Sequence, residues 1–272
     1  MMRKTIFITG TSSGLGKLTA KYFAEQGWNV AATMRTPEKE TELTQYNNIK
    51  IFKLDVTKTD EVKTAVAAAV AAFGKIDVVL NNAGMGTYGA LELAKEADID
   101  WQFAVNVRGP INVIRGFLPH FREQQGGRFI NVSSWMGLTT AVPLGSLYNM
   151  SKFALEGLTE GLYYELKPLN IDLHLIEQGG SADNNFQHNI AWNENPAIDA
   201  YDATTAKLKA IMGDTTRVLS DPMTIVTVIY SLATGASKQF RNVIGQDGKD
   251  LLALRNSVPI EQYLETVAAN FA

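Results

Sequence analysis

The chain has 272 residues, of which 46% are hydrophobic and 19% charged, and its formal net charge at pH 7 is -3. This size predicts one globular domain over residues 1–272 with a substantial apolar core. Cysteine is absent, which excludes disulfides and thiol nucleophiles. The three histidines are scattered, which argues against a metal site. The small negative net charge argues against a nucleic-acid partner.

The first apolar run, at residues 5–9, is too short for a signal peptide or a membrane span. No repeat, low-complexity stretch or linker divides the chain after it. We therefore expect a cytoplasmic protein with no membrane partner.

Short apolar runs then alternate with longer helical patterns. Strands are expected at residues 6–9, 29–34, 49–54, 78–81, 128–133 and 171–177, with helices between them. The first helix, residues 15–26, ends at Gly27, and the third, residues 60–73, ends at Gly74. This alternation predicts an α/β fold with a doubly wound parallel sheet, whose ligands bind at the carboxyl ends of the strands.

A glycine-rich segment follows the first strand. Gly10 ends the strand, while Gly14 and Gly16 open the first helix. Because glycines lack Cβ atoms, they let backbone N–H groups and the helix N-terminus approach a pyrophosphate. Taken alone, the segment fits a purely structural turn equally well.

Tyr148 and Lys152 lie one helical turn apart, about fourteen residues after Ser133 and Ser134. This spacing places both side chains on one helix face, where an ammonium group can lower the pKa of a phenol. The tyrosine could then exchange protons near neutral pH. In an arbitrary sequence, such a pair is more often exposed and amphipathic.

Five features occur in a fixed order along the chain. They are the glycine-rich turn of residues 9–16, Asn81-Asn82-Ala83-Gly84, Asn106, Ser134, and Tyr148 with Lys152. In this set the chain resembles the short-chain dehydrogenase/reductase family over residues 5–245. The resemblance implies a Rossmann-type sheet of strand order 3-2-1-4-5-6-7 and a nicotinamide-dependent oxidoreductase that acts on alcohol or carbonyl groups.

The resemblance also implies roles for the catalytic residues. Tyr148 would protonate the substrate carbonyl, Lys152 would lower the tyrosine pKa and hold the nicotinamide ribose, and Ser134 would bind the substrate oxygen. Asn106 would hold a water molecule that links the lysine to solvent; alternatively, it only caps or kinks its helix. The interval from Ser134 to the tyrosine is one residue longer than usual, so Ser133 is the fallback for the serine.

The end of the second strand indicates which cofactor is bound. NAD enzymes of this architecture usually have a carboxylate there, whereas this chain has Arg35. A guanidinium can pair with a 2′-phosphate, so we expect NADP(H); alternatively, Arg35 faces solvent and both cofactors bind. The expected cofactor-binding residues are Gly10, Ser12, Ser13, Gly14, Leu15, Gly16, Arg35, Asp55, Val56, Asn82, Ala83, Gly84, Tyr148, Lys152, Gln178 and Gly179.

Two of these positions have alternatives. Asp55, which resembles the family's adenine contact, could equally mark the start of a helix. After the sixth strand, Gln178 replaces the family's proline and Asp183 replaces the threonine that binds the carboxamide. Ser181 or a backbone group is then the substitute.

The loop after the serine and the segment of residues 181–214 are expected to select the substrate. Their large side chains predict an apolar pocket, which suits a hydrophobic ketone or alcohol. Alternatively, these side chains pack the loops onto the body or form an oligomer contact. The candidates are Trp135, Met136, Leu144, Phe186 and Trp192.

Assembly is expected from the resemblance alone. Helices at residues 98–125 and 148–166 form the dimer interface in relatives, which implies a homodimer or homotetramer. Apolar residues such as Phe103 and Val107 occur at helical spacing in the first of them, although that stripe could face the sheet. A tail at residues 248–272 ends in an amphipathic helix that could cover the cleft or a neighbouring subunit.

The principal hypothesis is an NADPH-dependent carbonyl reductase, reversible as an alcohol dehydrogenase, for a hydrophobic ketone. One alternative is an oxoacyl-type reductase of the same family. Another is a regulatory protein that senses NADP(H) without turnover, although the intact acid/base pair disfavours it. A structural protein with a relic site would bind no cofactor.

Overall fold

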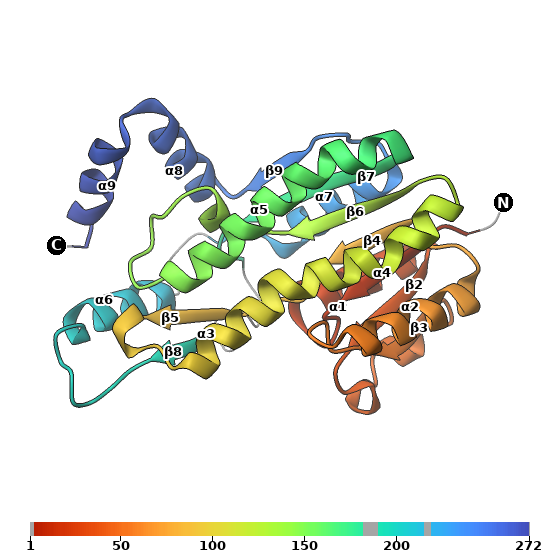
Figure 1. Ribbon diagram of the computed structural model, residues 1–272, viewed down its shortest axis with the longest axis horizontal. Helices are drawn as coiled ribbons and strands as arrows, with labels where there is room; N and C mark the ends of the chain where they lie inside the picture. Colours follow the sequence, from red (N-terminus) through yellow and green to blue (C-terminus); the bar gives the residue numbers. More distant parts are fainter. Residues whose placement is uncertain (1–2, 182–189, 215–218, 272) are drawn as a thin grey trace.

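The molecule is built on a seven-stranded parallel sheet with helices on both faces (Figure 1). The computed structural model describes residues 3–181, 190–214 and 219–271. The strands, in spatial order, are β3 (Ile49–Lys53), β2 (Asn29–Met34), β1 (Thr5–Thr9), β4 (Val78–Asn81), β6 (Gly127–Val132), β7 (Ile171–Gln178) and β9 (Arg241–Ile244). The predicted doubly wound fold and strand order are confirmed, with β9 as the seventh strand.

Helices pack on both faces of this sheet and beyond its end. They are α1 (Gly14–Glu25), α2 (Thr59–Phe73), α3 (Glu96–Phe103), α4 (Gly109–Glu123), α5 (Ser146–Leu166), α6 (Asp202–Gly213), α7 (Pro222–Thr234), α8 (Gln246–Ser257) and α9 (Ile260–Ala269). One apolar cluster joins α1 and α7 to the sheet around Phe23, and a second joins α2, α4 and α5 around Phe117. Every residue of β1 is buried, as expected for a strand covered on both faces.

The helix expected between β2 and β3 is absent from the described structure, so that prediction was wrong. Two 3₁₀ turns, Pro37–Lys39 and Leu43–Gln45, replace it. Glu40 accepts hydrogen bonds from the backbone N–H groups of Glu42 and Leu43, at 2.9 and 3.0 Å, and pairs with Lys17 of α1. These side-chain contacts hold the segment against α1 in a compact, non-helical form.

The helix expected at residues 98–125 is interrupted. A π-helical turn, Ala104–Arg108, joins α3 to α4. The apolar stripe also divides, because Phe103 is exposed whereas Val107 is buried. The π turn brings Asn106 inward, a placement that recurs at functional sites in other proteins.

A second, two-stranded sheet was not predicted. It pairs β5 (Gly86–Gly89) in parallel with β8 (Ile190–Asn193) and lies with α6 at the end of the molecule away from the N-terminus (Figure 1). A third apolar cluster joins this sheet to the tail helices. Its buried members are Tyr88, Trp135, Met136, Ala141, Tyr148, Leu208, Tyr263 and Val267.

The described residues contain neither a helix that could span a membrane nor a group of side chains that could bind a metal ion. Within residues 3–181, 190–214 and 219–271, every helix is too short or too polar to cross a lipid bilayer. The same ranges contain no group of three acidic or histidine side chains that could hold a metal ion.

Candidate active site

The glycine-rich turn between β1 and α1 requires glycine at two positions. Gly10 has a φ of +71°, which strains other residues. A Cβ atom on Gly16 would lie 2.2 Å from the Gly10 carbonyl oxygen and 2.5 Å from Nδ2 of Asn82. Ser13, the N-cap residue of α1, makes no side-chain capping bond, so the first turn of the helix presents N–H groups.

Asn82 and Ala83, after β4, fasten this turn to the sheet. The Asn82 side chain donates to the carbonyl oxygens of Thr9 and Gly10, at 3.0 and 3.1 Å. The backbone N–H groups of Asn82 and Ala83 both donate to the Thr9 hydroxyl at 3.0 Å. Two motifs separated by some seventy residues therefore form one rigid unit.

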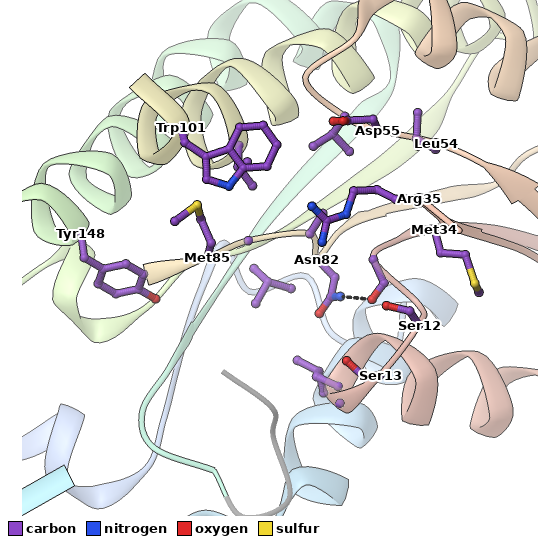
Figure 2. Close-up of a pocket in the computed structure, with 18 of the residues that line it drawn as sticks. Ser12, Ser13, Met34, Arg35, Leu54, Asp55, Asn82, Met85, Trp101 and Tyr148 are labelled. Atoms are coloured by element: carbon purple, nitrogen blue, oxygen red, sulfur yellow. Dashed lines mark hydrogen bonds between the residues drawn. The ribbon is translucent and has the colours of Figure 1, made fainter. Parts of the chain in front are cut away.

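A cleft with a volume of about 580 Å³ opens in front of this unit (Figure 2). Its walls contain every predicted cofactor-binding residue except Gly16 and Gly179. Sequence reasoning missed eight lining residues, which are Met34, Leu54, Met85, Asp98, Trp101, Val105, Val132 and Ala191. Most of them carry apolar side chains, which the sequence alone does not distinguish from ordinary core residues.

Arg35 lies on the wall of the cleft at the end of β2. Its exposed side chain reaches into the cleft between Asp55 and Ser12 (Figure 2). The Asp55 carboxylate accepts hydrogen bonds from the backbone and hydroxyl of Thr57, at 3.0 and 2.7 Å. Asp55 therefore both lines the cleft and stabilises the turn before α2, and its contact with the adenine stays a prediction.

Tyr148 is buried at the opposite end of the cleft. It forms a side-chain hydrogen bond with Ser134, whose oxygen also accepts from the Met136 backbone N–H at 3.2 Å. The fallback residue, Ser133, instead faces Glu156. The structure thus brings Ser134, not Ser133, to the tyrosine.

Burial controls the ionisation of Tyr148 and Lys152. It raises the pKa of the Tyr148 phenol far above its usual range, and the Ser134 hydrogen bond offsets this only in part. The Lys152 ammonium lies 5.6 Å from the tyrosine ring centre and donates to the Val132 carbonyl oxygen at 2.9 Å. Burial lowers the pKa of Lys152 to about 8, against an opposing effect of Glu156. Burial therefore dominates the pKa of Tyr148 in this structure, and the role of Lys152 in lowering that pKa stays a prediction.

Asn106 supports the lysine side of the cleft without lining it. Its side chain accepts from the Met85 backbone N–H at 2.9 Å and donates to the Met85 carbonyl oxygen at 2.8 Å and to the Ser151 hydroxyl at 3.1 Å. A Cβ atom on Gly84 would lie 3.6 Å from Oδ1 of Asn106 and 3.9 Å from Nζ of Lys152. Gly84 therefore lies near both side chains.

The end of β7 supplies a polar group to the cleft. Gln178 lines the cleft, and its buried Oε1 atom has no hydrogen-bond partner among the described residues. Gly179 packs tightly, since a Cβ atom there would lie 2.9 Å from both Asp247 and Trp135. Ser181 forms a bridge with Ser220, and Asp183 lies outside the described residues.

The four predicted substrate-pocket residues that the structure describes lie with Tyr148 in the third cluster, although none of these four lines the 580 Å³ cleft. Trp135 and Met136 are buried, Leu144 and Trp192 are half-buried, and Phe186 lies outside the described residues. The first two therefore pack the loop onto the body, as the alternative predicted.

Tyr88 of β5 is a further residue that sequence reasoning missed. Its ring stacks on Tyr148 with centres 5.7 Å apart and contacts Trp192 at 5.9 Å. Its hydroxyl bonds to the Met136 sulfur at 3.3 Å. No local pattern predicted this contact, because it depends on the pairing of β5 with β8.

Comparisons with known proteins agree with this geometry. A family model described as short chain dehydrogenase matches residues 4–194. A 3-ketodihydrosphingosine reductase from Bacteroides thetaiotaomicron is 34% identical over 249 residues, which cover 90% of this chain and 89% of that protein.

Solved structures share the fold. A short-chain dehydrogenase from Streptomyces avermitilis has a TM-score of 0.82 at 29% identity and covers 98% of this chain and 94% of its own. A 3-ketoacyl-(acyl-carrier-protein) reductase from Brucella melitensis, complexed with NADH, has a TM-score of 0.73 at 26% identity, with coverages of 89% and 96%. ElxO with NADP bound has a TM-score of 0.74 at 26% identity, with coverages of 89% and 97%.

Proposed function

The chain belongs to the short-chain dehydrogenase family of oxidoreductases, and from this premise we propose that it is an NADPH-dependent reductase of hydrophobic ketones. The observation that carries the proposal is the buried group of Ser134, Tyr148 and Lys152 at one end of a cleft whose other end is the glycine-rich turn. A proton donor and a dinucleotide-sized site thus share one cleft.

Tyr148 is the proton donor in this proposal. Because burial raises the pKa of its phenol, the group is protonated at neutral pH and ready to protonate a carbonyl oxygen. The hydrogen bond to Ser134 keeps both hydroxyls together, so one substrate oxygen can accept from both. When bound, the nicotinamide supplies the hydride.

In this proposal, Lys152 and Asn106 assist Tyr148. The Lys152 ammonium, held by the Val132 carbonyl, lies where it can bind the ribose hydroxyls and favour return of a proton to Tyr148. Asn106 fixes the backbone of Met85 beside it, which supports the family's water link to solvent. Both roles are extended from the family to this chain.

The chain's residues fit a nicotinamide dinucleotide. The Gly10–Gly16 contact and the uncapped start of α1 leave backbone N–H groups for the pyrophosphate. The unpartnered Oε1 of Gln178 can accept a hydrogen bond from the carboxamide NH₂ group. Arg35 can pair with a 2′-phosphate, and the NADP bound to ElxO supports that preference, although the Brucella reductase holds NADH.

The third cluster supports an apolar substrate. Tyr88, Trp192 and Leu144 surround Tyr148 with hydrocarbon and aromatic surface. The name of the Bacteroides relative supports a long-chain amino ketone as a member of this class. The name of the Brucella reductase favours a second candidate, a carrier-bound oxoacyl group.

We also propose that the chain forms a homodimer or homotetramer. Phe103 of α3 is exposed, and so are Met150 and Phe153 of α5, the helix beside it. These elements correspond to the interface expected from the family.

A ketone screen with both cofactors tests the proposal. Absorbance at 340 nm reports NADPH oxidation, and Trp101, which lines the cleft, provides a fluorescence signal for cofactor binding. We expect turnover of free long-chain or aryl ketones with NADPH. Turnover of carrier-bound oxoacyl groups alone would favour the second candidate, and binding without any turnover would favour a regulatory role.

A further inference from the structure

Three charged side chains meet one helical turn beyond Lys152 on α5. Glu156 lies one turn further along α5, Glu177 extends from β7, and Arg241 comes from the edge strand β9. Glu156 is 3% exposed and Glu177 is fully buried. Two buried carboxyl groups so close to a proposed active-site lysine require an explanation.

Arg241 connects this group to the surface. Its Nε atom lies 3.2 Å from Glu156 Oε2 and 3.8 Å from Glu177 Oε1, and its Nη2 atom lies 2.8 Å from Glu160. The Asn242 backbone N–H donates to Glu177 at 2.6 Å. The guanidinium is closer to Glu156 than to Glu177, so it stabilises the charge of Glu156 more strongly.

The two buried carboxyl groups oppose each other's ionisation. Burial and the neighbouring Glu156 charge raise the pKa of Glu177 to about 8, so Glu177 retains its proton. Burial also raises the pKa of Glu156, and the Ser133 hydroxyl, Arg241 and Lys152 oppose this in part. Glu156 therefore carries the negative charge of the pair.

The loop after β6 packs directly on this charge. A Cβ atom on Gly137 would lie 2.9 Å from the Ser133 hydroxyl and 3.0 Å from Glu156 Cγ. The same loop carries Ser134, the partner of Tyr148. The carboxylate is thus enclosed between α5, β7, β9 and the active-site loop.

We propose that Glu156 is a positioning residue for Lys152, and that its buried carboxylate keeps the ammonium group charged at physiological pH. This inference rests on the proposed function, because it concerns the lysine of that site. The charged and titratable groups that face Glu156 are Lys152 and Glu160 of its own helix, Glu177 of β7 and Arg241 of β9.

The direction of the expected pH shift follows from the pKa of Lys152. Burial lowers the pKa of Lys152 to about 8, and Glu156 acts in the opposite direction. Without that carboxylate the pKa would fall further, and the ammonium would lose its proton near neutral pH. Activity that needs the charged lysine is present below this pKa and is lost as pH rises through it.

The test compares the pH dependence of NADPH-driven ketone reduction in the wild type, Glu156→Gln, Glu177→Gln and Glu160→Gln. For Glu156→Gln, we expect the alkaline limb of the pH–rate profile, where activity is lost, to shift to lower pH by about one unit. Activity at low pH should stay near normal. Glu177→Gln mimics the protonated group, and Glu160 is exposed, so both limbs should stay in place. Glu156→Asp should restore the wild-type limb.

An unshifted limb in Glu156→Gln, or an equal loss of activity at every pH, would overturn the inference. If that variant does not fold, Glu156→Met replaces it and should shift the alkaline limb the same way, because it also removes the carboxylate. NMR titration of labelled lysine side chains, with Lys152→Met to identify the signal, measures the shift without turnover. A wild type that reduces no ketone refutes the proposed function, while the NMR titration still decides the role of Glu156.

Discussion

The protonation state of Tyr148 depends on its surroundings more than on its lysine. Tyr88, stacked on the ring, and Ser134, bonded to the hydroxyl, leave little space for solvent. A phenolate would lose its hydration there, so the neutral acid is the stable form. This state suits the reduction of a carbonyl, which consumes a proton.

The two reaction directions should therefore differ in pH dependence. Ketone reduction is expected to proceed at about pH 7, where a buried phenol is protonated. Alcohol oxidation needs the phenolate and should rise about tenfold per pH unit until Lys152 loses its proton at a pH of about 8. Initial rates in both directions measure this, and an oxidation rate that does not change with pH would contradict it.

Arg35→Asp should reverse the cofactor preference. The guanidinium that reaches into the cleft is replaced by a carboxylate, which repels a 2′-phosphate and can bind a ribose hydroxyl. The ratio of kcat/KM for NADPH to that for NADH should fall by about a hundredfold. Lys39→Asp, the same charge change on a neighbouring exposed residue, is the control. An unchanged ratio would mean that another residue binds the phosphate.

At the level of elements, the small β5–β8 sheet builds the substrate side of the site. It brings Trp192 to Tyr88 and holds Tyr88 against the proposed proton donor. Gly89 makes this pairing possible, because its φ is +123° and a Cβ atom would lie 2.5 Å from the Asn193 carbonyl oxygen. The Gly89 N–H also donates to Leu144, which ties the sheet to the loop before α5.

Gly89→Ala should disturb substrate use while sparing the cofactor. The forced Cβ separates β5 from β8, so kcat/KM for the ketone should fall at least tenfold with about the same NADPH affinity. Gly157→Ala, in open space on α5, is the matched control and should stabilise the fold slightly. Equal losses in cofactor and substrate binding would show that the small sheet does not act on the substrate side alone.

The six predicted strands match the structure within a residue at each end, because buried parallel strands are continuous apolar runs. The small strands could not be predicted: β5 reads Gly-Thr-Tyr-Gly, and two glycines in four residues disfavour a strand. Its pairing with β8, a hundred residues later, is a tertiary effect.

The candidate site likewise contains residues that could be predicted from the sequence and residues that could not. Residues within motifs, such as Gly10, Asn82 and Lys152, could be placed because their spacing fixes them at strand ends or on one helix face. Tyr88 could not, since its place depends on a strand pairing. Glu156 could not either, because its sequence context is that of an exposed helical glutamate and only the fold brings Arg241 of β9 against it.

At the scale of the whole molecule, the tail helices close the outer side of the third cluster. Tyr263 of α9 is fully buried, and its hydroxyl accepts a hydrogen bond from the Thr140 backbone N–H at 3.2 Å. Gly248 of α8 packs on Trp135. The amphipathic tail helix predicted from the sequence thus covers the active-site loop of its own chain.

The exposed apolar side chains of α3 and α5 lead to a prediction about assembly. Phe153→Glu should shift the protein toward monomers, because it places a charge within the proposed interface. Light scattering coupled to size-exclusion chromatography measures the mass. Ile260→Glu, an equally exposed apolar position on α9, should leave the mass unchanged. A wild type that is monomeric at every concentration would contradict the proposed interface.

Removal of one oxygen atom from Tyr148 tests its role as the proton donor. Tyr148→Phe keeps the ring stacked on Tyr88 and removes the hydroxyl bonded to Ser134. The rate of NADPH oxidation with the best ketone should fall by about a thousandfold or more, while Trp101 fluorescence shows cofactor affinity within about twofold of the wild type. Near-normal turnover in this variant would show that the proton comes from another group.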